Sequence, residues 1–80
     1  MSVQEAIAQR IRQLCNEKGF TPNGIAVHSA VPQGTVKSIL NGESQNPGVV
    51  NIKKLCDGFG LTLGEFFSTP EFDALEQEIK

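Results

Sequence analysis

One stretch of the sequence gathers uncharged hydrogen-bonding side chains at a helical spacing, with no carboxylate among them. In residues 33–41, QGTVKSILN, the apolar side chains of Val36, Ile39 and Leu40 fall on one side of a helix. The other side holds small or hydrogen-bonding residues and a single cation: Gln33, Gly34, Thr35, Lys37, Ser38 and Asn41. A surface helix that serves solubility alone usually mixes Glu with Lys, whereas a helix lying against phosphates excludes acids. This face therefore indicates contact with a nucleic acid.

The individual side chains of this face suit the reading of base edges. Gln33 stands at the N-terminal end of the helix, and a glutamine amide can bond adenine through two atoms. Lys37 would reach guanine or a phosphate. Gly34 costs about 1 kcal/mol relative to alanine inside a helix, and its bare backbone leaves room for close approach of DNA. The expected base-reading residues are Gln33, Gly34, Thr35, Lys37 and Ser38.

Helix starts and uncharged side chains nearby are expected to hold phosphates. Helices begin near residues 21–23 and 48–50, and the free N–H groups of such starts attract anions. Neutral hydrogen-bonding side chains would also fix the backbone in register. The expected phosphate contacts are Thr21, Asn23, Asn41, Ser44 and Asn46. Asn41 has a structural alternative as the C-cap of its helix, which does not exclude a phosphate contact.

The elements that position these residues are all helices, and capping signals separate them. Ser2-x-x-Glu5 forms a capping box before an apolar stripe that runs to about Lys18, where Gly19 ends the helix. The later helices are delimited by a proline near the start, by a glycine or Asn-Gly at the end, or by a second capping box. These helices are expected at residues 22–29, 32–41, 49–59, 62–67 and 70–80. The prediction is an all-α, compact five-helix domain over residues 1–69, with an acidic C-terminal helix over 70–80.

Residues 21–42 have the organisation of a helix-turn-helix. Two short helices are joined by about three residues, with Ala30 at the turn and Val31 after it. Ala26 is small enough for the two helices to cross closely. In this motif the second helix lies in the major groove of DNA.

Composition limits the other possibilities. The 80 residues fit one domain, and the net charge of −2 with a pI near 5.2 is low for a DNA-binding protein. The acidity belongs to the tail, because residues 1–60 carry +2 and residues 61–80 carry −4. No signal peptide or apolar span of membrane length stands out, so a cytoplasmic location is expected.

The chain offers little for metal or catalytic chemistry. Cys15 and Cys56 are far apart in sequence and His28 is the single histidine, so no zinc-site spacing exists. We expect buried free thiols, no metal and no cofactor. No nucleophile–base pair or carboxylate pair is recognisable, and we expect no enzyme activity.

The segments IAVHSAVPQGTVKSILNG and NIKKLCDGFGLTLGEFF, with Asn46-Pro47 between them, resemble the phage-repressor and Cro-like helix-turn-helix regulators of bacteria. The resemblance spans roughly residues 5–68. It implies five core helices and a homodimer on a near-palindromic operator, with the base-reading residues above facing base edges and Asn41 contacting phosphate. Three positions depart from the family pattern. Ala30 replaces a common turn glycine, Pro22 a frequent phosphate-binding glutamine, and Gly34 a side chain that often reads a base.

The expected function is sequence-specific binding of double-stranded DNA by a transcriptional regulator, a repressor acting as a homodimer. An antitoxin-like or other protein-interaction module of the same fold remains the alternative, with the acidic tail covering a protein partner. Whether the helix expected at 70–80 packs on its own chain or across a dimer stays open.

Overall fold

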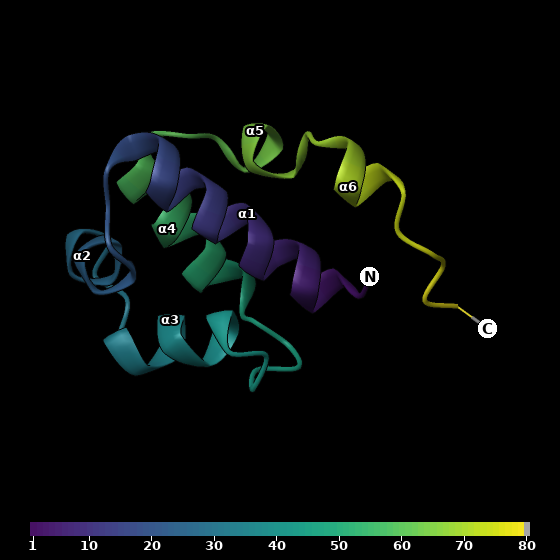
Figure 1. Cartoon of the computed structure of the whole chain (residues 1–80), viewed down its shortest axis with the longest axis horizontal. Coiled ribbons are helices and arrows are strands. Elements are labelled where there is room, and N and C mark those ends of the chain that lie inside the picture. Colours follow the sequence, from purple (N-terminus) through teal and green to yellow (C-terminus); the bar gives the residue numbers. More distant parts are fainter. Residues whose placement is uncertain (80) are drawn as a thin grey trace.

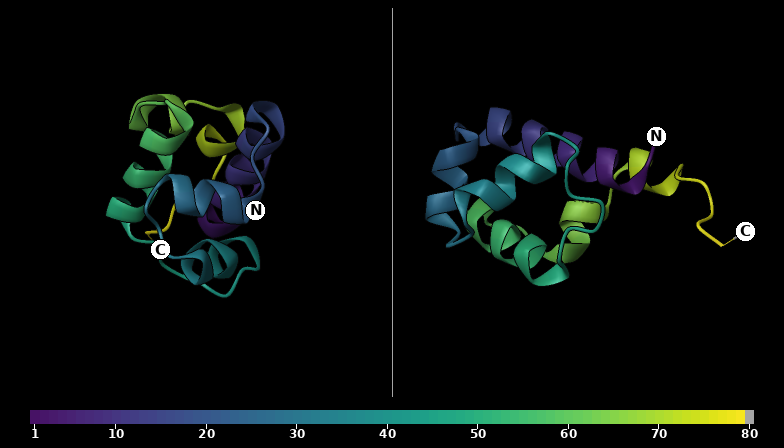
Figure 2. Two further views of the ribbon diagram at one scale, coloured as in Figure 1. Left: turned by 90° about the vertical axis from the view of Figure 1, so that its left-hand side faces the viewer. Right: turned by 90° about the horizontal axis from the view of Figure 1, so that it is seen from below.

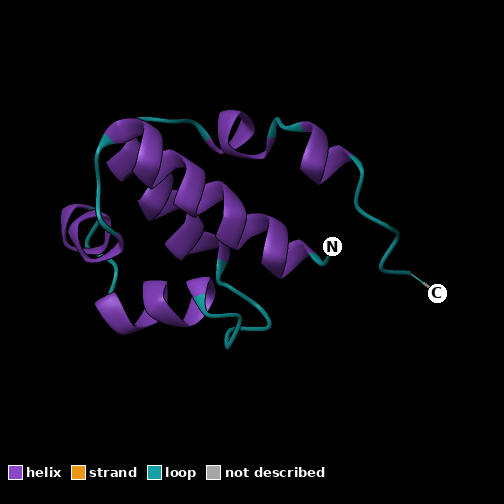
Figure 3. Ribbon diagram, in the orientation of Figure 1, coloured by secondary structure: helices purple, strands orange, loops and turns teal. Residues whose placement is uncertain are grey.

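The computed structural model describes residues 1–79 and contains six helices (Figure 1). They are α1 (Val3–Lys18), α2 (Pro22–His28), α3 (Gln33–Leu40), α4 (Val49–Phe59), α5 (Leu63–Phe67) and α6 (Pro70–Asp73). Over these 79 residues the remaining backbone is loop and turn, with no strand (Figure 3). The predicted all-α fold is confirmed.

The long helix α1 crosses the molecule, and the other helices pack around it and α4 (Figure 1). The core is made by apolar side chains from α1 to α5, among them the fully buried Ile11, Ile25, Ile39, Leu55 and Phe66. Burial of such side chains is the main favourable term that holds a domain this small together. Cys15 and Cys56 are free thiols buried in the same core.

The capping residues act at the ends where the sequence places them. The Ser2 hydroxyl accepts the N–H of Glu5, and the Thr21 hydroxyl accepts the N–H of Gly24 at 3.0 Å. Thr62 and Glu65 form a complete capping box, each side chain accepting the other residue's N–H. Gly19 ends α1 at φ 77°, a left-handed conformation that glycine adopts without steric cost. These local bonds satisfy helix-end groups that have no partner inside their helix.

The last helix is much shorter than the sequence pattern predicts. The prediction of a helix over residues 70–80 is wrong in extent: α6 begins at Pro70 but ends at Asp73, and residues 75–79 are not helical. Phe72 anchors α6 because its ring lies 4.9 Å from Phe67 and 6.1 Å from Phe66. Beyond it Ile79 is 89% exposed, so no apolar contact supports a further turn. A short helix without such packing is marginal in water. Lys80, the last residue of that prediction, lies outside the described residues.

None of the six helices is long and apolar enough to cross a membrane, in the part of the chain described.

Candidate DNA interface

The connection between α2 and α3 forms a tight turn. The N–H of Ser29 bonds the carbonyl of Ile25 at 2.9 Å, and the N–H of Val31 bonds that of Ala26 at 3.0 Å. Ile25 and Ala26 are completely buried, so α3 packs directly on α2 at the small alanine. Ala30 sits in the turn at φ 56°. The turn therefore takes the left-handed conformation that usually calls for glycine.

The side chains of α3 divide into an inner and an outer face. Val36 and Ile39 are buried against the core, and Leu40 is partly buried beside them. The predicted base-reading residues all lie on the solvent side: Gln33, Gly34 and Lys37 are exposed, and Thr35 and Ser38 are half-buried. This face has free access, because α3 lies at the lower edge of the molecule in Figure 1 and toward the viewer in the right panel of Figure 2. The structure thus brings the five residues together on one accessible helix face.

The predicted phosphate contacts lie in three places around α3. Thr21 and Asn23 are exposed at the start of α2, where the Thr21 hydroxyl also caps the helix. Asn41 and Ser44 follow the end of α3 directly. Asn41 takes the C-cap position named above as its structural alternative, and its side-chain amide donates to Glu43 Oε1 at 3.4 Å. Asn46 is exposed in the loop before α4.

Arg12 holds α3 in place, a role that sequence reasoning missed. One guanidinium nitrogen, Nη2, donates to the carbonyl of Leu40 at 3.1 Å, so an α1 side chain caps the C-terminus of α3. A cation at this end also complements the negative end of the helix dipole. Arg12 is 28 positions away from Leu40 in sequence, and no local signal announces the contact.

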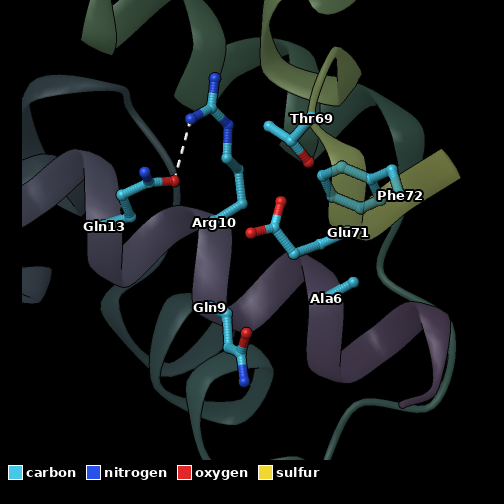
Figure 4. Close-up of a pocket in the computed structure, with 7 residues that line it drawn as sticks. All are labelled: Ala6, Gln9, Arg10, Gln13, Thr69, Glu71 and Phe72. Carbon is cyan, nitrogen blue, oxygen red and sulfur yellow. Dashed lines mark hydrogen bonds between the residues drawn. The ribbon is translucent and has the colours of Figure 1, made fainter. Parts of the chain in front are cut away.

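Arg10 does the same for α5. Its Nε donates to the carbonyl of Phe66 at 2.8 Å and its Nη2 to that of Glu65 at 2.9 Å. A third nitrogen, Nη1, donates to Gln13 Oε1 at 3.0 Å, and the group lines a small pocket between α1 and α6 (Figure 4). Both arginines of the chain are therefore committed to carbonyls of their own fold.

His28, Lys53 and the two cysteines also have structural surroundings. The ring of His28, the last residue of α2, lies 5.4 Å from the Phe20 ring. Lys53 pairs with Asp57 one turn along α4. Burial raises the pKa of the Cys15 and Cys56 thiols, and Asp57 raises that of Cys56 further. The thiols are thus held in the protonated, weakly nucleophilic form.

Sequence reasoning also missed Glu43, which follows the C-terminal turn of α3. This residue borders a hollow together with Gly34, Thr35, Ser38 and Ser44. α3 itself carries no acidic residue, but Glu43, which follows the turn after this helix, brings a carboxylate close to it.

Comparison with known proteins agrees with this geometry. A sequence model of the Cro/C1-type helix-turn-helix DNA-binding domain matches residues 10–71. The crystal structure of the prophage Lp1 protein 11 has the same fold, with a TM-score of 0.82 and 24% identity over 92% of this chain and 97% of that chain. No curated protein matches the sequence.

The family match spans the whole α2–α3 unit and most of the core that supports it. Domains of this type bind DNA and are typically not enzymes. The chain belongs to the Cro/C1-type helix-turn-helix family of DNA-binding domains.

Proposed function

We propose that this protein is a transcriptional repressor that binds an operator in double-stranded DNA with α3 in the major groove. One observation carries the proposal. The helix that follows the tight turn presents five accessible small or hydrogen-bonding residues, one of them a cation, and no acid.

In this arrangement the residues have distinct tasks. Gln33, exposed at the first position of α3, reads adenine through its amide. Lys37 lies one turn further along the same face and reaches a guanine or a phosphate. Thr35 and Ser38 offer hydroxyls to base edges. Gly34 has no atom within 4 Å of the place where a Cβ would stand, so the surface there is open to a base pair.

The phosphate contacts frame this face. Thr21 and Asn23 lie at the start of α2, where helix N–H groups also point outward. Asn41, Ser44 and Asn46 follow α3 and contact the DNA backbone on the far side of this helix. The phosphate contacts fix the orientation of the protein on the duplex, whereas the contacts to bases determine which DNA sequence is bound.

The active form is a homodimer on an inverted repeat, with half-site centres about 34 Å apart, one turn of the double helix. Exposed apolar residues at the start of α4 favour such an assembly: Val49 is 67% and Val50 is 65% exposed. The tail does not offer a helical stripe for dimerisation, because Ile79 follows the end of α6.

A second candidate function is binding of a protein partner through the tail, as in an antitoxin-like module. The exposed Ile79 among Glu71, Asp73, Glu76 and Glu78 favours it, because an apolar side chain within an acidic segment suits a basic protein surface. Capture of a partner by the full chain but not by a chain ending at Asp73, with DNA binding intact in both, would support this function.

Selection of binding sites from a random duplex pool tests the main proposal. The full chain should enrich an inverted repeat at low and physiological salt. Gln33→Ala should lose preference at one base pair per half-site, a change of about 1–3 kcal/mol there. Gln9→Ala, which alters an exposed glutamine on α1, serves as the matched control and should leave the profile unchanged. If the wild-type chain enriches no sequence at either salt, the proposal fails.

A further inference from the structure

A shallow hollow runs along one flank of the outer face of α3. It has a volume of about 500 Å³ and is lined by Pro32, Gly34, Thr35, Ser38, Glu43 and Ser44. Gly34 leaves it open, since a Cβ there would meet nothing within 4 Å. The hollow therefore adjoins the positions that are expected to meet base edges.

The backbone after α3 fixes Glu43 at the wall of this hollow. Gly42 turns the chain at φ 74°, and the N–H groups of Glu43 and Ser44 then both bond the carbonyl of Ser38, at 2.9 and 3.2 Å. These two bonds fold residues 43–44 back along the last turn of the helix. The Asn41 amide, which donates to Glu43 Oε1 at 3.4 Å, holds the carboxylate near the helix end.

The polar groups of the hollow determine what it can accept. The hydroxyls of Thr35, Ser38 and Ser44 donate or accept, whereas the Glu43 carboxylate only accepts. No cation lines the hollow, so a phosphate oxygen is repelled from the position next to the Glu43 carboxylate. A complementary base edge must present a hydrogen-bond donor.

Only two bases offer an amino donor in the major groove, adenine at N6 and cytosine at N4. At adenine the neighbouring N7 is an acceptor, which repels a carboxylate, whereas at cytosine the neighbouring group is C5–H. Guanine and thymine present the acceptors O6, N7 and O4. Cytosine is therefore the base that the Glu43 carboxylate fits.

We propose that Glu43 is a specificity-determining residue, whose carboxylate accepts a hydrogen bond from the N4 amino group of a cytosine that Gly34 leaves room for. The inference rests on the proposed binding of α3 in the major groove and adds one base preference to it. It would make this protein's readout extend past the helix into the turn that follows.

Binding-site selection with the wild-type chain, Glu43→Gln and Glu17→Gln tests the inference. Glu43→Gln keeps the size of the side chain. Its one amide oxygen accepts from Asn41, so its NH2 group, a donor, is left to face the cytosine amino group in place of an acceptor. Wild type should select a cytosine at one position of each half-site, and Glu43→Gln should lose that preference by about tenfold. Glu17→Gln removes the same charge from an exposed site on α1 and should leave the profile unchanged.

A modified operator tests the atom itself. Replacing the selected cytosine with an analogue that lacks the exocyclic amino group should weaken wild-type binding about tenfold, at equal salt. The same replacement should not affect Glu43→Gln.

The possible failures are distinguishable. If wild type enriches no sequence, the proposed function fails and the role of Glu43 with it. If wild type enriches an operator and Glu43→Gln tightens binding to all sequences equally, the carboxylate only repels phosphate and the Glu43 inference alone is overturned. An unchanged profile for Glu43→Gln, or full binding of wild type to the analogue, overturns it as well.

Discussion

Ala30 is strained in the turn between α2 and α3, and replacing it with glycine should stabilise the domain. Its φ of 56° is the one positive value at a non-glycine residue in the described part of the chain. A left-handed conformation costs an L-residue with a Cβ about 1–2 kcal/mol. Glycine avoids this cost, but the greater conformational entropy that it gives the unfolded chain opposes folding by about 0.4–1 kcal/mol. Because Ala30 is exposed, loss of its methyl group removes no core contact. The net gain for Ala30→Gly is about 0.5–1 kcal/mol.

Urea unfolding followed by circular dichroism measures this gain. With an m-value of about 1 kcal/mol/M for a small domain, the midpoint should rise by about 0.5–1 M at unchanged m. The melting temperature should rise by about 2–8 °C.

Gly19→Ala is the reverse control. Gly19 has φ 77° and nothing within 4 Å of a built Cβ, so the substitution adds backbone strain without a clash. It should lower the free energy of unfolding by about 1 kcal/mol. A lower urea midpoint for Ala30→Gly would refute the reasoning, because it would mean that the Ala30 methyl contributes more than its left-handed backbone costs.

Three further predictions concern a buried hydroxyl, an acid and a cation. The Ser29 hydroxyl is buried without a hydrogen-bond partner in the described structure, so Ser29→Ala should raise the free energy of unfolding by about 1 kcal/mol. A Cβ at Gly58 would stand 1.9 Å from that hydroxyl oxygen. Gly58→Ala should therefore lower the free energy of unfolding by about 1–3 kcal/mol in the same urea assay, and adding Ser29→Ala should restore part of this loss. The backbone N–H of Thr62 lowers the pKa of the Glu65 carboxyl from its ordinary value. The capping box therefore stabilises the fold at pH values above the unfolded-state pKa of Glu65, and this contribution is lost as the pH falls through the lowered folded-state pKa. Glu65→Gln should therefore flatten the acid limb of a stability-against-pH curve, and an unchanged limb would contradict this. Lys37 is the one cation on α3. A plot of the logarithm of the DNA association constant against the logarithm of the salt concentration should therefore have a slope of about −1 per protomer, and Lys37→Ala should bring this slope close to zero. A wild-type slope several units steeper would show that lysines outside α3 bind phosphate.

Features that depend on neighbouring residues were predictable from the sequence. Ser2, Thr21 and Thr62 cap helices because each finds its N–H partner three residues away. The inner face of α3 follows from the spacing of its apolar residues alone. Such local signals need no knowledge of the rest of the fold.

Features that depend on distant contacts were not predictable. The capping-type start at Thr69-Pro70 and the periodic Phe72, Leu75 and Ile79 favour a longer helix than α6. The helix ends once the aromatic cluster around Phe72 is passed, and periodicity cannot reveal what covers a stripe.

The candidate site shows the same division. Its residues on α3 follow from the helix period, whereas Glu43 reaches the site through a turn whose backbone bonds lead back to Ser38. Arg10 contacts a carbonyl 55 positions away, and counting charges along the chain gives no sign of it.

The use of both arginines as helix caps bears on how this protein would discriminate between DNA sequences. Non-specific binding of proteins to DNA is almost entirely electrostatic. Here the net charge is −2, Arg10 and Arg12 bond backbone carbonyls, and Glu43 borders the hollow beside α3. We therefore expect attraction to an arbitrary duplex to be weak. Affinity for an operator would then come mainly from neutral donors, helix N-termini and base contacts, with Lys37 as the one cation of α3. We infer that a low charge makes this domain selective, because a site that lacks the matching bases offers it little else to bind.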